Sequence, residues 1–150
     1  TGMREQTQNV AKIIECEIEA GMSNIEFYSG FQAKANKVKN DLLVFLIEAQ
    51  KAGKTVAGYG AAAKGNTLLN YAGIRPDVLP YVVDRNPAKQ DKFLPGSRIP
   101  ILTEEALKQN KPDYVLILPW NLHDEVAEQL SYIREWGGQF VTSVPSLKVG

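Results

Sequence analysis

A glycine-rich segment over residues 54–65, Lys-Thr-Val-Ala-Gly-Tyr-Gly-Ala-Ala-Ala-Lys-Gly, is the part of the chain best suited to bind a phosphate. It is typical of a buried strand that ends in a tight turn and continues into a helix. Gly58, Gly60 and Ala63 match the G-x-G-x-x-G/A spacing of dinucleotide-type turns, where a helix N-terminus faces an anion. Lys64 adds a cation there. The same glycines also fit a purely structural turn.

A second polar segment follows the next predicted strand along the chain. It reads Asp84-Arg85-Asn86 and is followed by a proline. Asp84 stands at roughly the 20-residue separation from the turn at which an acidic residue binds a ribose hydroxyl. The alternative is that Asp84 only caps its own turn, because Asp-Arg-Asn-Pro is ordinary turn chemistry.

A third polar segment follows a strongly apolar strand and contains Trp120, Asn121 and His123. Trp120 is suited to stack on a base or sugar, or to pack at a domain boundary. Asn121 could contact a ligand or cap the next helix. His123, beside Asp124, could be a general base or an exposed histidine.

We predict no catalytic residue and no metal ligand in this chain. The predicted substrate-binding residues come from all three segments: Gly58, Tyr59, Gly60, Lys64, Asp84, Arg85, Asn86, Trp120, Asn121 and His123.

The first third of the chain has a helical pattern. One apolar face, which ends near Gly21, consists of Val10, Ile13, Ile14 and Ile18. A second apolar stripe, with steps of three and four residues from Tyr28 to Ala49, predicts one long helix over residues 25–52 that ends at Gly53. We expect this lead-in, residues 1–53, to pack on the sheet or on an upstream domain.

Strands and helices alternate over residues 54–150. Strands are predicted over 55–59, 79–84, 98–102, 113–118 and 139–144. Helices are predicted over 61–72, after a Thr103 cap, and over 122–136 after an Asn121 cap. This order predicts an α/β, Rossmann-like domain whose mostly parallel sheet has helices on both faces. Ligands of such sheets bind beyond the carboxyl ends of the strands, where the three polar segments lie.

Composition limits the class of protein. The chain has 150 residues, with 17 basic and 17 acidic side chains, so we expect neither a nucleic acid nor a membrane surface as its partner. Cys16 is the single cysteine, which excludes an internal disulfide, and its apolar neighbours predict a buried side chain.

No apolar run approaches the roughly 18 residues of a membrane span, so we expect a cytoplasmic protein. The helical start without an initiator methionine suggests a piece of a longer protein.

Three kinds of site are disfavoured by the residues. The strand before the glycine turn reads Thr55-Val56-Ala57, without the acidic end typical of an S-adenosylmethionine site. We therefore expect this domain not to bind that cofactor. A single histidine and no serine elbow also disfavour a histidine-cluster metal site and a serine hydrolase.

Four blocks of the sequence together resemble one family. They cover residues 58–74, 83–96, 112–122 and 133–140, and include Gly-Tyr-Gly-Ala-Ala-Ala-Lys-Gly-Asn-Thr-Leu-Leu-Asn, Val-Asp-Arg-Asn-Pro-Ala-Lys-Gln and Tyr-Val-Leu-Ile-Leu-Pro-Trp-Asn-Leu. In this order they resemble the C-terminal domain of the S-adenosylmethionine-dependent sugar C-methyltransferases. The helical lead-in is similar in placement.

The resemblance implies a three-part parent protein. A zinc-binding region and a middle methyltransferase domain, which binds S-adenosylmethionine, would precede this chain and contain the catalytic residues. The reaction implied is C-methylation of a nucleotide-linked keto-deoxysugar, in which an enolate attacks the methyl group of the cofactor. This chain would form the substrate side of the cleft, bind no cofactor itself and have no turnover alone. Two other classes stay open: a non-catalytic module for a nucleotide such as NAD or CoA, and a purely structural domain.

Overall fold

The computed structural model describes residues 8–150, which belong to two compact units, Thr1–Asn36 and Lys37–Gly150. The first helix that the structure describes is α1 (Gln8–Glu19), none of whose residues is buried. Its predicted apolar face is therefore exposed, with Ile13 and Ile18 each more than half accessible. Cys16 is exposed too, so the prediction of a buried Cys16 is wrong.

The predicted long helix over residues 25–52 is two helices. Helix α2 (Ile25–Ser29) ends at Gly30, whose N–H bonds the carbonyl of Tyr28, and α3 (Phe31–Lys51) begins directly after it. Glycine has a low helix propensity, which allows the break. The predicted end at Gly53 is confirmed: Gly53 has φ 68°, and the Lys54 N–H bonds the Ala49 carbonyl, as in a Schellman cap.

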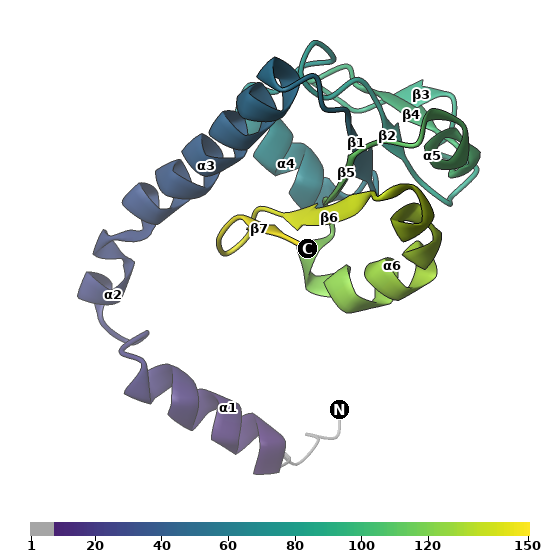
Figure 1. Cartoon of the computed structure of the whole chain (residues 1–150). Helices are drawn as coiled ribbons and strands as arrows, with labels where there is room; N and C mark the ends of the chain where they lie inside the picture. Colours follow the sequence, from purple (N-terminus) through teal and green to yellow (C-terminus); the bar gives the residue numbers. More distant parts are fainter. Residues whose placement is uncertain (1–7) are drawn as a thin grey trace. The chain divides into compact units, whose positions relative to one another are not determined.

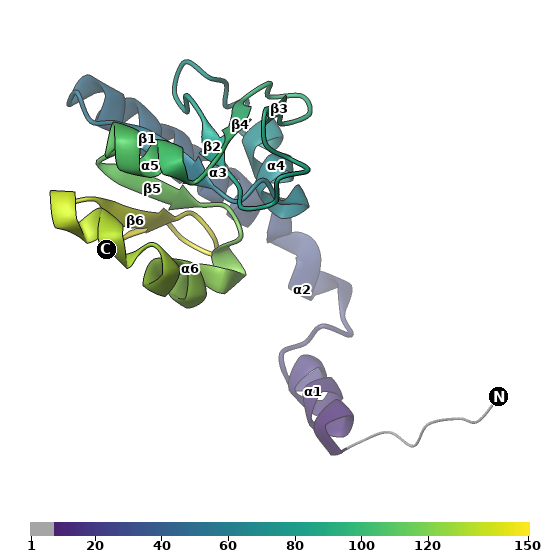
Figure 2. The same ribbon diagram turned by 90° about the vertical axis from the view of Figure 1, so that its right-hand side faces the viewer.

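One seven-stranded sheet forms the centre of the second unit, in the order β3-β4-β2-β1-β5-β6-β7 (Figures 1 and 2). The five parallel strands are β4 (Pro100–Leu102), β2 (Val82–Val83), β1 (Val56–Tyr59), β5 (Tyr114–Ile117) and β6 (Gln139–Thr142). Two short strands, β3 (Lys92–Phe93) and β7 (Lys148–Val149), pair antiparallel at the two edges and were not predicted. The prediction of a mostly parallel α/β sheet is confirmed.

Alternating strand residues divide the core into two clusters. Val56 and Leu116 join Leu42 and Leu46 of α3 and Leu69 of helix α4 (Ala63–Tyr71). The intervening positions pack instead against α5 (Glu105–Asn110) and α6 (His123–Gln129). This is the period of two expected of strands that are buried on both sides. In Figure 1, α4 and α6 accordingly flank the sheet.

The predicted helix over residues 122–136 is divided into three parts. A 3₁₀ turn, η1 (Trp120–Leu122), precedes α6, and a second 3₁₀ segment, η2 (Ser131–Trp136), follows it. Asn121 lies inside η1 and caps no helix, and α5 has Glu104, not Thr103, at its N-terminal boundary with no side-chain cap. Both capping predictions are therefore wrong.

Candidate functional site

The glycine turn between β1 and α4 is closely packed. A Cβ atom at Gly60 would lie 2.6 Å from Cδ of Pro119, and one at Gly58 would lie 2.7 Å from Cγ2 of Val82. Gly60 also has φ 89°, which favours glycine. The close neighbour of Gly60 in this structure is therefore Pro119, the proline that follows β5, and a substrate contact at Gly60 stays a prediction.

Helix α4 approaches the sheet through a residue that the motif did not identify. A Cβ atom at Gly65 would lie 2.5 Å from Cβ of Leu118, whereas Ala63, the third small residue of the G-x-G-x-x-G/A spacing, is exposed. The contact explains why a glycine stands inside the first turn of a helix, where it is otherwise unfavourable. Glycines inside predicted helices are the signal that could have found it.

The N–H groups of the turn are hydrogen-bonded within the protein. The amides of Gly58 and Gly60 donate to the carbonyls of Tyr81 and Val83, at 3.0 and 2.8 Å. The Ala61 amide donates to Oδ2 of Asp84 at 2.7 Å. This is the arrangement expected of a structural turn. Beyond it, α4 has no side-chain cap, so no capping side chain covers the positive end of its dipole.

Asp84 connects the end of β2 to this turn. Its side chain is 11% exposed; Oδ2 accepts from Ala61 N–H and from Lys89 Nζ at 3.1 Å, and Oδ1 accepts from Asn86 N–H at 2.8 Å. Lys89 also donates to the Ala61 carbonyl at 3.0 Å. These hydrogen bonds are the ones expected if Asp84 only caps its own turn. A ribose contact at Asp84 stays a prediction.

Arg85 and Asn86 point to other partners. The Nε atom of Arg85 lies 3.5 Å from Oε2 of Glu104, and the Asn86 side chain accepts from the Ala88 amide at 2.9 Å. Arg85 is thereby directed toward the loop after β4, and Asn86 toward its own turn. A substrate contact for either residue stays a prediction.

Tyr59 lies in the core cluster of α5 and α6 and is 7% exposed. Its hydroxyl accepts from Gln129, which also donates to Glu104 at 3.1 Å, and Tyr132 donates to the same carboxylate at 3.2 Å. Burial is the main cause that raises the pKa of Tyr59 and of Tyr132 above the ordinary value. Both hydroxyls therefore stay protonated at neutral pH, and sequence reasoning did not identify this network.

Lys64, Trp120 and Asn121 come together from different elements, as the sequence predicted they would at the strand ends. Lys64 Nζ donates to Oδ1 of Asn121 and lies 5.2 Å from the centroid of the Trp120 ring. Within the described residues, Lys64 forms no ion pair with a carboxylate. The amide and the ring orient the ammonium group without neutralising it, which leaves a cation available to an anionic ligand.

Trp120 also lines a hollow of about 560 Å³ beside β6 and β7. His123 borders it and lies 2.8 Å from Asp124, and Arg134 lies 5.3 Å from the centroid of the Phe140 ring. Neither Arg134 nor Lys148, which also borders it, has an acidic partner among residues 8–150. Asp124 also borders the hollow, which thus combines aromatic surface with one acid and two cations that lack acidic partners in that part of the chain, and suits an anionic ligand that contains a ring.

Arg134 and Lys148 were not predicted as site residues. Lys148 reaches the hollow on β7, a two-residue strand that the sequence pattern did not reveal. In residues 8–150 we find no group of three or more His, Cys, Asp or Glu side chains placed to hold a metal ion. The helices of this part also include none that is long and apolar enough to span a membrane.

Comparison with known proteins places the chain in a family. Residues 1–145 match the model of the C-methyltransferase C-terminal domain. The chain belongs to this family. It is also 34% identical over 140 residues to C-methyltransferase NovU from Streptomyces niveus. The aligned region covers 93% of this chain and 33% of that protein. The resemblance to C-methyltransferases inferred from the four sequence blocks is confirmed, and the chain spans a third of the relative's length.

Proposed function

We propose that this domain binds the nucleotide-linked keto-deoxysugar substrate of an S-adenosylmethionine-dependent C-methyltransferase. It would form one side of the substrate cleft, and an upstream domain of the same cytoplasmic protein would bind the cofactor. The family supports a methyltransferase, and the small share of the relative that is matched supports a separate location for the methyl-transfer machinery. On this proposal the isolated domain binds substrate but has no turnover.

The observation that carries the proposal is the Lys64–Trp120–Asn121 arrangement next to the cationic hollow. A nucleotide-linked sugar contains a diphosphate, a base and a sugar ring. Lys64, at the uncapped start of α4, can offset the diphosphate charge. Trp120 offers a ring face for stacking, and Arg134 adds a second cation at the hollow.

The topology supports a Rossmann-like use of the sheet. Its parallel strands have the order β4-β2-β1-β5-β6, so the chain reverses direction across the sheet between β1 and β5. In such sheets ligands bind beyond the carboxyl ends at this switch point. Gly60 and Pro119 meet there, and Lys64 Nζ lies 5.2 Å from the ring centroid of Trp120, the residue after Pro119.

The residues described here bind and orient, and none is assigned a proton transfer. S-adenosylmethionine would supply the methyl group from the upstream domain, and zinc would belong to the region before it. The contribution of this domain would be to offset the diphosphate charge, to hold the sugar and to exclude water from its face of the cleft.

The test is an NMR titration of the domain with dTDP, dTDP-glucose, NAD and S-adenosylmethionine. Saturable shifts at residues 63–65 and 120–121 with the two dTDP ligands support the proposal. Lys64→Ala should weaken dTDP binding about tenfold, because it removes one charge-assisted contact. Lys34→Ala, at an exposed lysine of α3, removes the same charge and should leave binding unchanged.

A purely structural domain is the competing function, and the saturated N–H groups of the glycine turn favour it. It requires that none of the four ligands shifts residues 63–65 or 120–121. Shifts with NAD alone would instead support the nucleotide-module alternative. Either result contradicts a substrate-side role.

A further inference from the structure

Two arginines lie at the edge of the sheet opposite the candidate site. Arg75 comes between α4 and β2, and Arg98 comes just before β4, so both precede parallel strands. Lys64 and Trp120 instead follow parallel strands at the carboxyl edge. Any ligand of the two arginines is therefore separate from a ligand of the candidate site.

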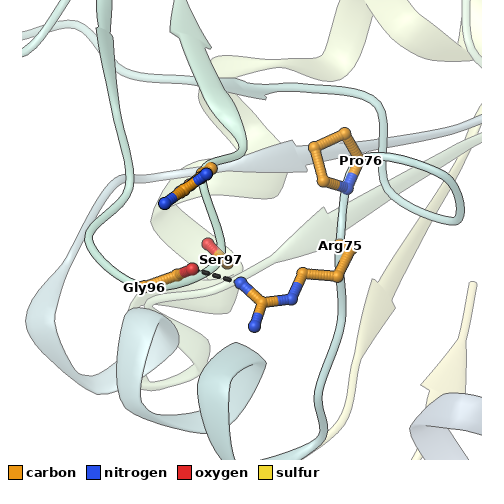
Figure 3. Close-up of a pocket in the computed structure, with 5 residues that line it drawn as sticks. Arg75, Pro76, Gly96 and Ser97 are labelled. Atoms are coloured by element: carbon orange, nitrogen blue, oxygen red, sulfur yellow. Dashed lines mark hydrogen bonds between the residues drawn. The ribbon is translucent and has the colours of Figure 1, made fainter.

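The two arginines border a pocket of about 440 Å³, together with Pro76, Gly96 and Ser97. Figure 3 shows Arg75 and Pro76 on one segment facing the loop that contains Gly96 and Ser97. A guanidinium N–H of Arg75 donates to the Gly96 carbonyl across the gap. This hydrogen bond orients Arg75 and leaves most of its five N–H groups free for another acceptor.

The loop that carries Arg98 is held in place by its backbone. Leu94 N–H donates to the Ile99 carbonyl at 2.9 Å, and Arg98 N–H donates to the Leu94 carbonyl at 3.0 Å. Asn70 of α4 donates to the Pro95 carbonyl at 2.9 Å. Arg98 itself has φ 59°, a conformation uncommon for an arginine. Arg98 is thus presented from an ordered loop.

The pocket has positive charge that the described residues do not neutralise. Neither Arg75 nor Arg98 forms an ion pair within residues 8–150. Ser97, which also lines the pocket, is 1% exposed, and its Oγ has no hydrogen-bond partner in that part of the chain. A buried hydroxyl without a hydrogen-bond partner is unfavourable, and a rotation about χ1 would direct it to a ligand oxygen.

We propose that this pocket binds a phosphate group between the guanidinium groups of Arg75 and Arg98, with Ser97 Oγ as a further donor. Two guanidinium groups provide several N–H donors and two positive charges, which match the oxygens and the double charge of a phosphate. A carboxylate offers two oxygens and one charge, and leaves one cation without compensation. The site is independent of the proposed substrate cleft.

The experiment is an NMR titration of the whole chain with inorganic phosphate, methyl phosphate and acetate at constant ionic strength. Saturable shifts at residues 75 and 96–98 with a phosphate, and much weaker ones with acetate, are expected. Tighter binding of inorganic phosphate would indicate a free phosphate ion as the ligand, and tighter binding of methyl phosphate would indicate a phosphate ester. Equal binding of acetate, or shifts confined to residues 63–65 and 120–121, would overturn the proposal.

Matched variants assign the binding to the pocket. Arg75→Gln and Arg98→Asn should each weaken phosphate binding about tenfold, and asparagine tolerates the left-handed conformation at position 98. Arg98→Lys keeps the charge and should retain part of the affinity, which checks that the loop still folds. Lys34→Gln removes a charge elsewhere and should change nothing; an equal loss in this control would overturn the assignment.

Discussion

Each end of the parallel sheet has an aspartate that pairs with a lysine within the protein, and other cations that form no ion pair among the described residues. At the carboxyl end, Asp84 ties β2 to the glycine turn, and Lys64 lies beside Trp120. At the amino end, Asp113 accepts from Lys54 Nζ at 2.7 Å and from the Thr55 amide at 2.8 Å. The aspartates have partners within the protein, whereas the other cations have no acidic partner in the described part of the chain. This difference suggests that the aspartates stabilise the fold and that the unpaired cations bind ligands.

The ends differ in how tightly they are packed. Asp84 has an 11% exposed side chain and accepts a hydrogen bond from the glycine turn. In that turn, a Cβ atom at Gly60 would clash with Pro119, and one at Gly58 would clash with Val82. Asp113 has a 33% exposed side chain, and the pair it forms with Lys54 is open to solvent. Changes at the carboxyl end should therefore cost more stability than equivalent changes at the amino end.

The largest effect is expected from Gly60→Ala. The new methyl group would meet Pro119 at 2.6 Å in a backbone conformation that alanine disfavours, so the free energy of unfolding should fall by about 3 kcal/mol. Gly73→Ala is the matched control, because Gly73 has φ 68° and no atom within 4 Å of a Cβ; it should cost about 1 kcal/mol. Urea unfolding measures both. Equal losses would mean that the contact with Pro119 does not matter.

The next effect compares the two aspartates. Asp84→Asn should lower the free energy of unfolding by about 2 kcal/mol, because a buried acceptor of three hydrogen bonds is changed. Asp113→Asn should cost about 1 kcal/mol, since solvent screens its more exposed ion pair. Chemical unfolding at pH 7 gives both values. A greater loss at Asp113 would contradict the difference in packing.

Acid should remove the contribution of Asp113. Its hydrogen bond to Lys54 is the largest cause that lowers its pKa from 3.8 to about 2, followed by the bond from the Thr55 amide. Because the folded pKa is below the unfolded one, this stabilisation is present above about pH 5 and is lost as the pH falls toward 2. The stability difference between the wild type and Asp113→Asn should therefore shrink between pH 6 and pH 2. A constant difference would contradict the assigned cause.

The smallest effect on stability is expected from Lys64→Ala. Lys64 is exposed and has no acidic partner in the described part of the chain, so the free energy of unfolding should change by less than about 0.5 kcal/mol. Thermal unfolding with and without dTDP separates the two roles. The proposed function requires that only the increase in melting temperature caused by dTDP is reduced.

Local patterns predicted the elements better than their ends or contacts. The buried strand before Gly60 and the apolar strand before Leu118 are both present, because strands buried on two faces are continuously apolar. The break at Gly30 and the divided helix around α6 were missed, because helical periodicity continues across a short interruption. The strands β3 and β7 have two residues each, too few to show an alternation.

The candidate site was predicted only in part, because some of its residues lie on elements that local patterns reveal and others do not. The sequence predicted that the polar segments lie together at the carboxyl ends of the strands, and Lys64 and Trp120 do approach one another there, after neighbouring parallel strands. Arg134 and Lys148 could not be predicted, because they reach the hollow from a 3₁₀ segment and an edge strand. The pairing of Arg75 with Arg98 depends on a loop whose conformation no local pattern specifies.

By itself the sequence determined the α/β class, the glycine turn and the C-methyltransferase family, because these depend on residue types and spacings along the chain. The tertiary structure decided which polar groups are used up and which stay available. Asp84 and the turn amides bond within the protein, while Lys64, Arg75 and Arg98 have no acidic partner among the described residues. Hydrogen bonds and ion pairs require contact between side chains distant in sequence, and only the packing of the elements brings those side chains within reach.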